Sequence, residues 1–258
     1  MTAGTEDRTL WIRRYHPADQ DAVRLLCLPH AGGSASFFHP VSQALAPAVE
    51  VLAVQYPGRQ DRRQEAFVDN VPELADRLLP VLLAEAETDT DRPLAVFGHS
   101  MGASLAFEVT ARLEEADVPP VMLFASGRRA PSRFREEENV HTGGDQALLT
   151  EMKRLAGTDN RILGDEEMLQ MILPALRNDY RAAELYRPER YHLIKTPVTA
   201  LTGDADPKAT LDSVQAWSEH TTGEFRMEVF SGGHFYLVGQ APQVIKEIKA
   251  TLAAFMGR

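Results

Sequence analysis

The sequence predicts an α/β protein built on a mostly parallel, doubly wound sheet, and three observations lead to this prediction. Short apolar runs rich in β-branched residues alternate along the chain with longer helix-like segments. The central runs lack the apolar–polar alternation of a half-exposed strand, as expected where helices cover both faces of a sheet. The 258 residues are also enough to bury one large core. We therefore expect a single domain spanning residues 1–258.

Seven strands are expected, and in chain order they are Leu10–Tyr15, Val23–Leu28, Val49–Gln55, Leu94–Phe97, Val121–Ala125, Val198–Thr202 and Phe225–Phe230. The helix-like segments between and after them are Phe37–Leu45, Glu73–Glu87, Gly102–Glu115, Val214–His220 and Pro242–Met256. Strand and helix thus alternate over most of the chain, which is the pattern of parallel crossover units.

Residues 128–195 break this alternation. They contain no convincing strand, only a charged loop and two helical stretches, Gln146–Leu155 and Glu166–Tyr186. We interpret the region as a helical lid over the C-terminal edge of the sheet. The alternative is an ordinary long crossover, although a crossover usually needs only one helix.

Composition narrows the classes of function. Lys and Arg number 27 against 37 Asp and Glu, so the net charge of −10 argues against a nucleic-acid partner. The single Cys27 excludes an internal disulfide and a cysteine-based zinc cluster. The polar N-terminus has no signal-peptide core, and no apolar stretch is long enough to span a membrane. We expect a cytoplasmic protein without a membrane partner.

The most informative motif is Gly98-His99-Ser100-Met101-Gly102, a G-x-S-x-G sequence. It follows an apolar strand and precedes a helix-like run, which is the setting of a nucleophile elbow. There the chain turns so sharply that side chains at Gly98 and Gly102 would collide with their neighbours. Ser100 is thus a candidate nucleophile, and the alternative is a plain glycine-rich turn.

A serine nucleophile needs a base and an orienting acid, which in this arrangement follow it in the order acid, then histidine. Of the four histidines after Ser100, only His234 directly follows a strand, in the glycine-containing loop Ser231–Phe235. The acid should follow an earlier strand, where Asp204 and Asp206 compete. Spacing alone does not choose between them, and Asp204 is also suited to closing the turn.

An early loop, Pro29-His30-Ala31-Gly32-Gly33, also follows a strand directly. In this arrangement such a loop supplies one oxyanion-hole N–H, and the residue after the nucleophile supplies the other. Those donors would be the backbone amides of Ala31 and Met101. The alternative for the early loop is a glycine turn without a catalytic role.

Two other features have structural explanations by default. Asp204 and Asp206 alone do not make a metal site, and we expect neither a metal nor another cofactor. A stripe with helical spacing runs through residues 168–176, and its members are Met168, Leu169, Met171, Ile172, Leu173 and Leu176. Core packing is its usual role, but on a lid Met168, Met171 and Ile172 would line an acyl-chain pocket.

Taken together, these motifs resemble the stand-alone type II thioesterases of polyketide and nonribosomal peptide synthases, a branch of the α/β-hydrolases. The matching segments run from residue 28 to 237, and they read LPHAGGSAS, QYPGRQDR, FGHSMGA, FASGRRAPS, LRNDYRAAE, TGDADP and SGGHFYL. The resemblance implies an α/β-hydrolase fold with a helical lid. It also implies a triad of Ser100, Asp206 and His234, because the acid of the family is the second carboxylate of its Gly-Asp-x-Asp pattern.

The implied substrate is an acyl group held on the phosphopantetheine arm of an acyl or peptidyl carrier protein. Such enzymes remove stalled acyl groups or release a product. Two other functions fit the same residues: a carboxylesterase or lipase with this triad, and a non-catalytic binding module.

Carrier proteins are generally acidic, so a partner of this kind needs a local basic surface on a chain whose own charge is −10. Two groups of arginines follow strands that lead toward Ser100: Arg59, Arg62 and Arg63, and then Arg128, Arg129, Arg133 and Arg135. We expect them to contribute to carrier docking. The alternative is that they are solvated, or that they pair with acidic residues of the chain itself.

Overall fold

The computed structural model describes residues 8–89, 91–135, 139–155, 166–188 and 193–256. Its strands form one sheet in the order β1-β3-β2-β4-β5-β6-β7, in which all neighbours are parallel except the antiparallel pair β1 and β3. The strands are β1 Ile12–Arg13, β2 Val23–Leu28, β3 Val49–Val54, β4 Leu94–His99, β5 Met122–Ser126, β6 Val198–Gly203 and β7 Phe225–Phe230. The predicted α/β class is confirmed. The first strand is shorter than expected, because Leu10 and Trp11 belong to a helical turn.

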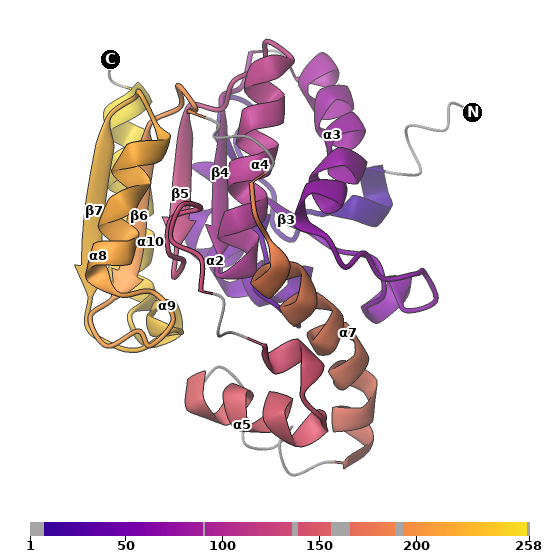
Figure 1. The fold of residues 1–258 in the computed structure, drawn as a ribbon. Helices are drawn as coiled ribbons and strands as arrows, with labels where there is room; N and C mark the ends of the chain where they lie inside the picture. The colour runs from indigo at the N-terminus through magenta and orange to yellow at the C-terminus, as the bar shows by residue number, and fades with distance from the viewer. Residues whose placement is uncertain (1–7, 90, 136–138, 156–165, 189–192, 257–258) are drawn as a thin grey trace.

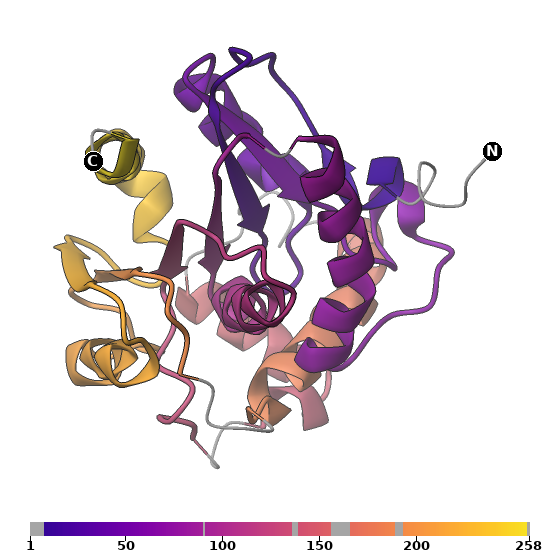
Figure 2. The same ribbon diagram turned by 90° about the horizontal axis from the view of Figure 1, so that it is seen from above.

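Helices cover both faces of the sheet (Figures 1 and 2). One face carries α3 Val71–Thr88, α4 Met101–Glu115 and α8 Leu211–Gln215, and the other carries α2 His39–Leu45 and α10 Ala241–Met256. The six buried residues of β2 explain why this strand reads as a continuous apolar run. Leu26 and Leu28 belong to the core beneath α3 and α4, whereas Leu25 and Cys27 belong to the core beneath α2 and α10.

Besides the helical turn that contains Leu10 and Trp11, the described residues form five further short helices: η1 Ala35–Phe38, η2 Gln60–Arg62, η3 Val140–Thr142, η4 Ala216–His220 and α9 Tyr236–Gly239. None of the helices described is both long and apolar enough to cross a membrane.

Between β5 and β6 the chain forms α5 Asp145–Leu155 and α7 Glu166–Leu185. We refer to residues 139–155 and 166–188 as the lid, because they lie beyond one end of the sheet (Figure 1) and cover the serine that follows β4. The lid has its own apolar cluster, formed by Leu148, Met152, Leu173, Leu176 and Tyr180. The second half of α7 enters the main core through Ala182 and Ala183.

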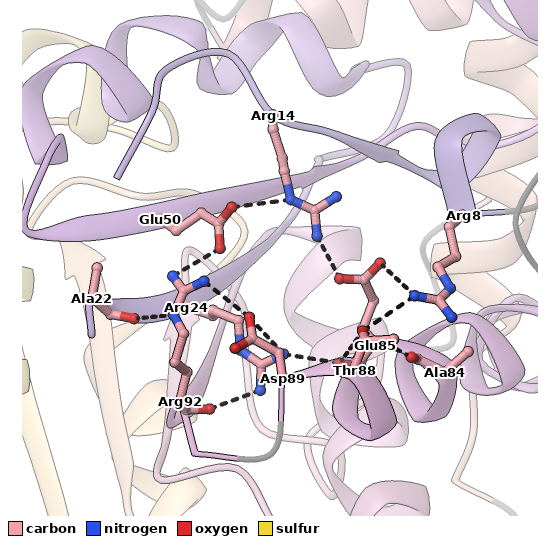
Figure 3. Close-up of polar contacts among 10 residues, drawn as sticks. All are labelled: Arg8, Arg14, Ala22, Arg24, Glu50, Ala84, Glu85, Thr88, Asp89 and Arg92. Carbon is pink, nitrogen blue, oxygen red and sulfur yellow. Dashed lines mark hydrogen bonds and ion pairs between the residues drawn. The ribbon is translucent and has the colours of Figure 1, made fainter. Parts of the chain in front are cut away.

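Arginines and carboxylates form a network at the amino end of the sheet (Figure 3). Glu50 on β3 accepts a hydrogen bond from Arg14 and pairs with Arg92, whose Nη1 also bonds to Asp89 at 2.9 Å. Arg24 on β2 is buried and donates to the Arg92 carbonyl at 2.7 Å and to the Glu85 carbonyl at 3.3 Å. The network therefore ties the starts of β2 and β3 to the end of α3.

Candidate active site

Ser100 lies in the sharp turn between β4 and α4, with φ 56° and ψ −117°. This left-handed backbone is unusual for a residue with a side chain and is typical of a nucleophile elbow. A Cβ at Gly98 would lie 2.0 Å from the Gly102 carbonyl oxygen, and one at Gly102 would lie 2.1 Å from the Leu28 carbonyl oxygen. Both glycines are thus required by the close approach of backbone to backbone.

His234 and Asp206 lie beside this serine. The distance from Ser100 Oγ to His234 Nε2 is 2.9 Å, and His234 Nδ1 is 2.9 Å from Asp206 Oδ2. The side chains of His234 and Asp206 are buried, and the second oxygen of Asp206 accepts the backbone N–H of Lys208 at 2.8 Å. Because a carboxylate only accepts hydrogen bonds, this geometry assigns the proton to Nδ1 and leaves Nε2 free to accept from Ser100.

Asp204 is exposed and lies in a different position. Its Oδ1 accepts the backbone N–H of Gly232 at 2.9 Å and so joins the loop after β6 to the loop before His234. Of the two aspartates that spacing left open, only Asp206 contacts the histidine ring.

The two backbone amides expected to form an oxyanion hole flank Ser100. Met101 is the first residue of α4, where an N–H has no partner within the helix. Ala31 lies in a tight turn closed by a 2.9 Å hydrogen bond from the Gly33 N–H to the His30 carbonyl, and it lines the same cavity as Ser100. Ala31 thus shares a cavity with Ser100, and Met101 follows the serine directly in the chain.

Two further histidines surround the site. Burial, with smaller contributions from the neighbouring His234 and Arg59, lowers the pKa of His30 to about 3. Burial and the same neighbour also hold the pKa of His99 well below its ordinary value, and His99 Nδ1 lies 2.9 Å from Ser126 Oγ. Both rings are thus neutral near pH 7, so they add no positive charge beside His234.

A cavity of about 230 Å³ opens onto Ser100 and His234. Its apolar wall comes mostly from the lid, through Met152, Leu155, Ile172, Leu176 and Tyr180. Of the three residues expected to line an acyl pocket, Ile172 does so. The expectation was wrong for Met168 and Met171, which are 44% and 76% exposed and do not line the cavity. Their positions on α7 turn them to the outside, while Leu173 and Leu176 are buried on the inner side.

Known proteins share both sequence and fold with this chain. A family model described as the thioesterase domain matches residues 23–252. The chain belongs to the thioesterase family. It is a serine hydrolase acting on thioesters, of the type II kind, with the fold of an α/β-hydrolase.

Three relatives illustrate the match. A probable cadicidin biosynthesis thioesterase of Streptomyces griseus is 51% identical over 252 residues, covering 98% of this chain and 68% of the relative. The thioesterase PikA5 of Streptomyces venezuelae is 50% identical over 252 residues, covering 97% of this chain and 88% of the relative. The solved structure of the type II thioesterase BorB, from the borrelidin biosynthetic cluster, is 50% identical with a TM-score of 0.87, covering 93% of this chain and 97% of that one.

The arginines expected to dock a carrier divide into buried and exposed residues in this thioesterase. The expectation of a docking surface was wrong for Arg59, Arg62 and Arg129, because all three are buried. Arg59 pairs with Asp179. Arg62 binds the Glu65 carboxylate and the Gln55 carbonyl, and its guanidinium lies 4.3 Å from the centre of the Trp11 ring.

Arg63 is exposed, and so is Arg133, which pairs with Glu219. Arg128 is half-buried and lines the cavity, where it donates to Ser104 Oγ at 3.0 Å and to the Ala183 carbonyl at 2.6 Å. Its contacts join the loop after β5 to the lid helix α7, so Arg128 is part of the cavity wall of the thioesterase.

Proposed function

We propose that this thioesterase hydrolyses acyl groups from the phosphopantetheine arm of an acyl or peptidyl carrier protein in polyketide or nonribosomal peptide biosynthesis. The observation that carries the proposal is the 2.9 Å contact between Ser100 Oγ and His234 Nε2 at the mouth of an apolar cavity. The names of its relatives, among them the BorB thioesterase of a biosynthetic cluster, support the pathway. The proposal places the enzyme in the cytoplasm with its synthase, where it would clear stalled acyl groups or release a product.

The proposed reaction uses a nucleophile, a base and two N–H donors around the thioester carbonyl, with Asp206 behind the base. His234 Nε2 takes the Ser100 hydroxyl proton as Oγ attacks the thioester carbon, and the N–H groups of Ala31 and Met101 stabilise the oxyanion. Asp206 keeps the ring oriented and stabilises its positive charge. The C–S bond then breaks, and His234 returns the proton to the leaving thiolate. In the second half His234 takes a proton from water as the water oxygen attacks the acyl carbon. The bond from this carbon to Ser100 Oγ then breaks, His234 returns the proton to Oγ, and the free acid leaves. These steps call on no metal or cofactor.

The lid gives the acyl group its binding site. The side chains of Met152, Leu155, Ile172 and Leu176 offer an apolar surface close to Ser100, which suits the hydrocarbon part of an acyl chain. Two polar residues of the wall, Glu184 and Lys208, are held by other residues of the chain: Glu184 accepts from the His141 backbone N–H at 3.1 Å, and Lys208 pairs with Glu151 at 2.7 Å.

Carrier docking is proposed for the exposed arginines Arg63 and Arg133. Charge reversal at Arg63 should raise KM for an acyl-carrier substrate and leave KM for a small acyl-pantetheine unchanged, and added salt should reduce the difference. Charge reversal at the adjacent, buried Arg62 is the contrasting variant, since it should destabilise the fold and slow the hydrolysis of both substrates. Equal losses on both substrates with Arg63→Glu would contradict docking at this residue.

The deciding experiment compares acyl groups on a carrier protein with matched oxygen esters of the same acyl chain. We expect faster hydrolysis of the thioester and an acyl adduct on Ser100 detectable by mass spectrometry under rapid quench. Faster hydrolysis of the oxygen ester would favour a carboxylesterase. Failure of both hydrolysis and fluorophosphonate labelling at Ser100 would favour a non-catalytic module.

A further inference from the structure

Asp179 is a fully buried carboxylate on the lid helix α7, and the proposed mechanism does not use it. Its Oδ2 accepts the backbone N–H of Gly32 at 2.8 Å and also binds the guanidinium of Arg59. The other oxygen accepts from the Asn178 side-chain amide at 3.2 Å. A lid residue thus bonds directly to the backbone of the turn that contains Ala31.

The turn around Ala31 is fixed on both sides. Gly32 has φ +75°, and the Gly33 N–H closes the turn onto the His30 carbonyl. Because Asp179 holds the N–H of Gly32, the peptide plane after Ala31 cannot rotate freely, and the direction of the Ala31 N–H is restricted with it. Oxyanion donors act only when they already point at the place where charge develops.

Two apolar contacts join α7 to the same turn. A Cβ at Gly32 would lie 2.6 Å from Leu176 Cδ1, so this leucine lies directly against the turn. Ala31 itself packs against the apolar cluster of the lid. The turn therefore takes its shape partly from the lid helix and not from the sheet alone.

Arg59 completes the arrangement from the loop after β3. It is buried beside Asp179, donates to the Pro57 carbonyl at 2.8 Å and lies 5.0 Å from the centre of the Tyr56 ring. Tyr56 in turn donates its hydroxyl to the Pro29 carbonyl at 3.0 Å, just before the turn. Asp179 and Tyr56 thus hold the His30–Gly33 turn from both sides, and Arg59 balances the buried negative charge.

A role in stability alone does not account for these contacts. Replacing a buried ion pair by well-packed apolar residues is often neutral or stabilising, so such a pair is weak evidence for stabilisation. Here, however, the carboxylate also binds a backbone N–H next to an oxyanion donor. We propose that Asp179 is a positioning residue that aligns the Ala31 N–H, so that the oxyanion hole is complete only when α7 is seated on the turn.

This inference rests on the proposed oxyanion role of Ala31, and two double variants test it. Arg59→Met with Asp179→Asn removes both charges and keeps an oxygen that accepts the Gly32 N–H. Arg59→Met with Asp179→Leu removes the charges and the acceptor while keeping a similar volume. Neither variant leaves an uncompensated buried charge, so we expect both to fold.

The measurements are kcat and KM for an acyl-pantetheine, the rate of fluorophosphonate labelling of Ser100 and the melting temperature. The Asn double variant should stay within a few-fold of the wild-type kcat. The Leu double variant should lose about 10- to 100-fold in kcat and in labelling rate, with little change in KM, as expected when a catalytic donor is misplaced rather than removed. The control Arg177→Gln changes a neighbouring α7 residue whose contacts, to the His141 carbonyl and Asp145, stay within the lid, and it should leave kcat unchanged.

Equal kcat and labelling rates in the two double variants would overturn the proposal, as would losses that follow the melting temperature instead of the acceptor. The labelling rate does not depend on the acyl carrier. If the wild-type protein is labelled but does not hydrolyse carrier thioesters, the proposed substrate fails and the role of Asp179 is still decided by labelling.

Discussion

At the amino end of the sheet carboxylates are shared between arginines, whereas at the carboxyl end two buried carboxylates bind the loops around Ser100. Each carboxylate of the amino-end network is bound by two arginines; Glu50, for instance, is held by Arg14 and Arg92. At the carboxyl end Asp206 bonds to His234, and Asp179 bonds to the N–H of Gly32. Similar groups thus join elements of the sheet and α3 at one end and hold the loops around Ser100 at the other. Substitutions at the two ends should therefore separate loss of stability from loss of rate.

The largest effect is expected at the nucleophile. Ser100→Ala should lower kcat about 10⁶-fold, as loss of a triad serine does elsewhere, because no other group supplies the attacking oxygen. The melting temperature should stay close to wild type, since the small hydroxyl contributes little packing. Steady-state hydrolysis measures kcat, and a thermal melt measures the melting temperature. Residual activity near wild type would mean that Ser100 is not the nucleophile.

The second effect compares the two aspartates after β6. Asp206→Asn should lower kcat about 10⁴-fold, since an amide no longer favours the required ring tautomer. Asp204→Asn should cost far less, because Asp204 contacts the Gly232 N–H and not the ring. The kcat values of the two variants decide the matter, and a greater loss at Asp204 would contradict the assignment.

The third effect is a pH dependence of the free energy of unfolding, which arises from two buried histidines at the carboxyl end of the sheet. In the folded protein the pKa of His30 is about 3 and that of His99 lies well below 6.5, so below pH 6.5 the unfolded chain binds more protons at these rings. The free energy of unfolding should therefore decrease as pH falls from 6.5, with a slope that approaches about 1.4 kcal/mol per pH unit for each histidine. Urea denaturation between pH 6.5 and about 4.5 measures this slope.

Two variants sharpen that measurement. His99→Gln should flatten the slope, because one ring no longer takes up a proton on unfolding. Arg24→Met, at the other end of the sheet, should leave the slope unchanged. An unchanged slope in His99→Gln would show that the pH dependence comes from other groups.

The fourth effect is a loss of stability without loss of rate at the amino end. Arg24→Met removes the donors for the Glu85 and Arg92 carbonyls and should lower the free energy of unfolding by about 2 kcal/mol. The kcat of the folded enzyme should not change. Arg14→Gln is the matched variant, and since its carboxylates keep other arginines, it should cost less than about 1 kcal/mol. A fall in kcat for Arg24→Met in fully folded enzyme would show that the two ends are coupled.

The smallest effect is a change in chain-length selectivity within the lid. Ile172→Trp should narrow the cavity and lower kcat/KM for long acyl chains about 10-fold relative to short ones. Met171→Trp, on the exposed side of the same helix, should leave the ratio unchanged. Values of kcat/KM for a series of acyl-pantetheines measure this ratio. The same change of the ratio in both variants would contradict the assignment of the cavity.

Local sequence patterns predicted most of the helices and strands, because each is encoded by the residues of its own segment. β2 and β7 have the predicted bounds, Val23–Leu28 and Phe225–Phe230, since apolar runs end at turn residues. The elbow was predictable because the requirement for glycine at 98 and 102 is local. The four-residue helix α9 is too short to produce a helical period, and it was missed.

Contacts between distant segments were not predictable in this way. Asp179 and Gly32 are 147 positions apart, and a single carboxylate in a helix looks like a surface residue until its partners are known. Arg59 and Arg62 were misinterpreted for the same reason, because an arginine-rich loop does not reveal which guanidinium groups have internal partners. For the stripe on α7 a signal did exist: Ile172, Leu173, Leu176 and Tyr180 follow the helical period more closely than Met168 and Met171 do.

Pro174 divides α7 into two parts with different attachments. A proline has no N–H to donate to the preceding turn, so the helix is weakest there. Before it, Met168 and Met171 are exposed; after it, Asp179, Ala182 and Ala183 are buried. Amide hydrogen exchange should therefore be graded along one continuous helix, fast before Pro174 and slow after it.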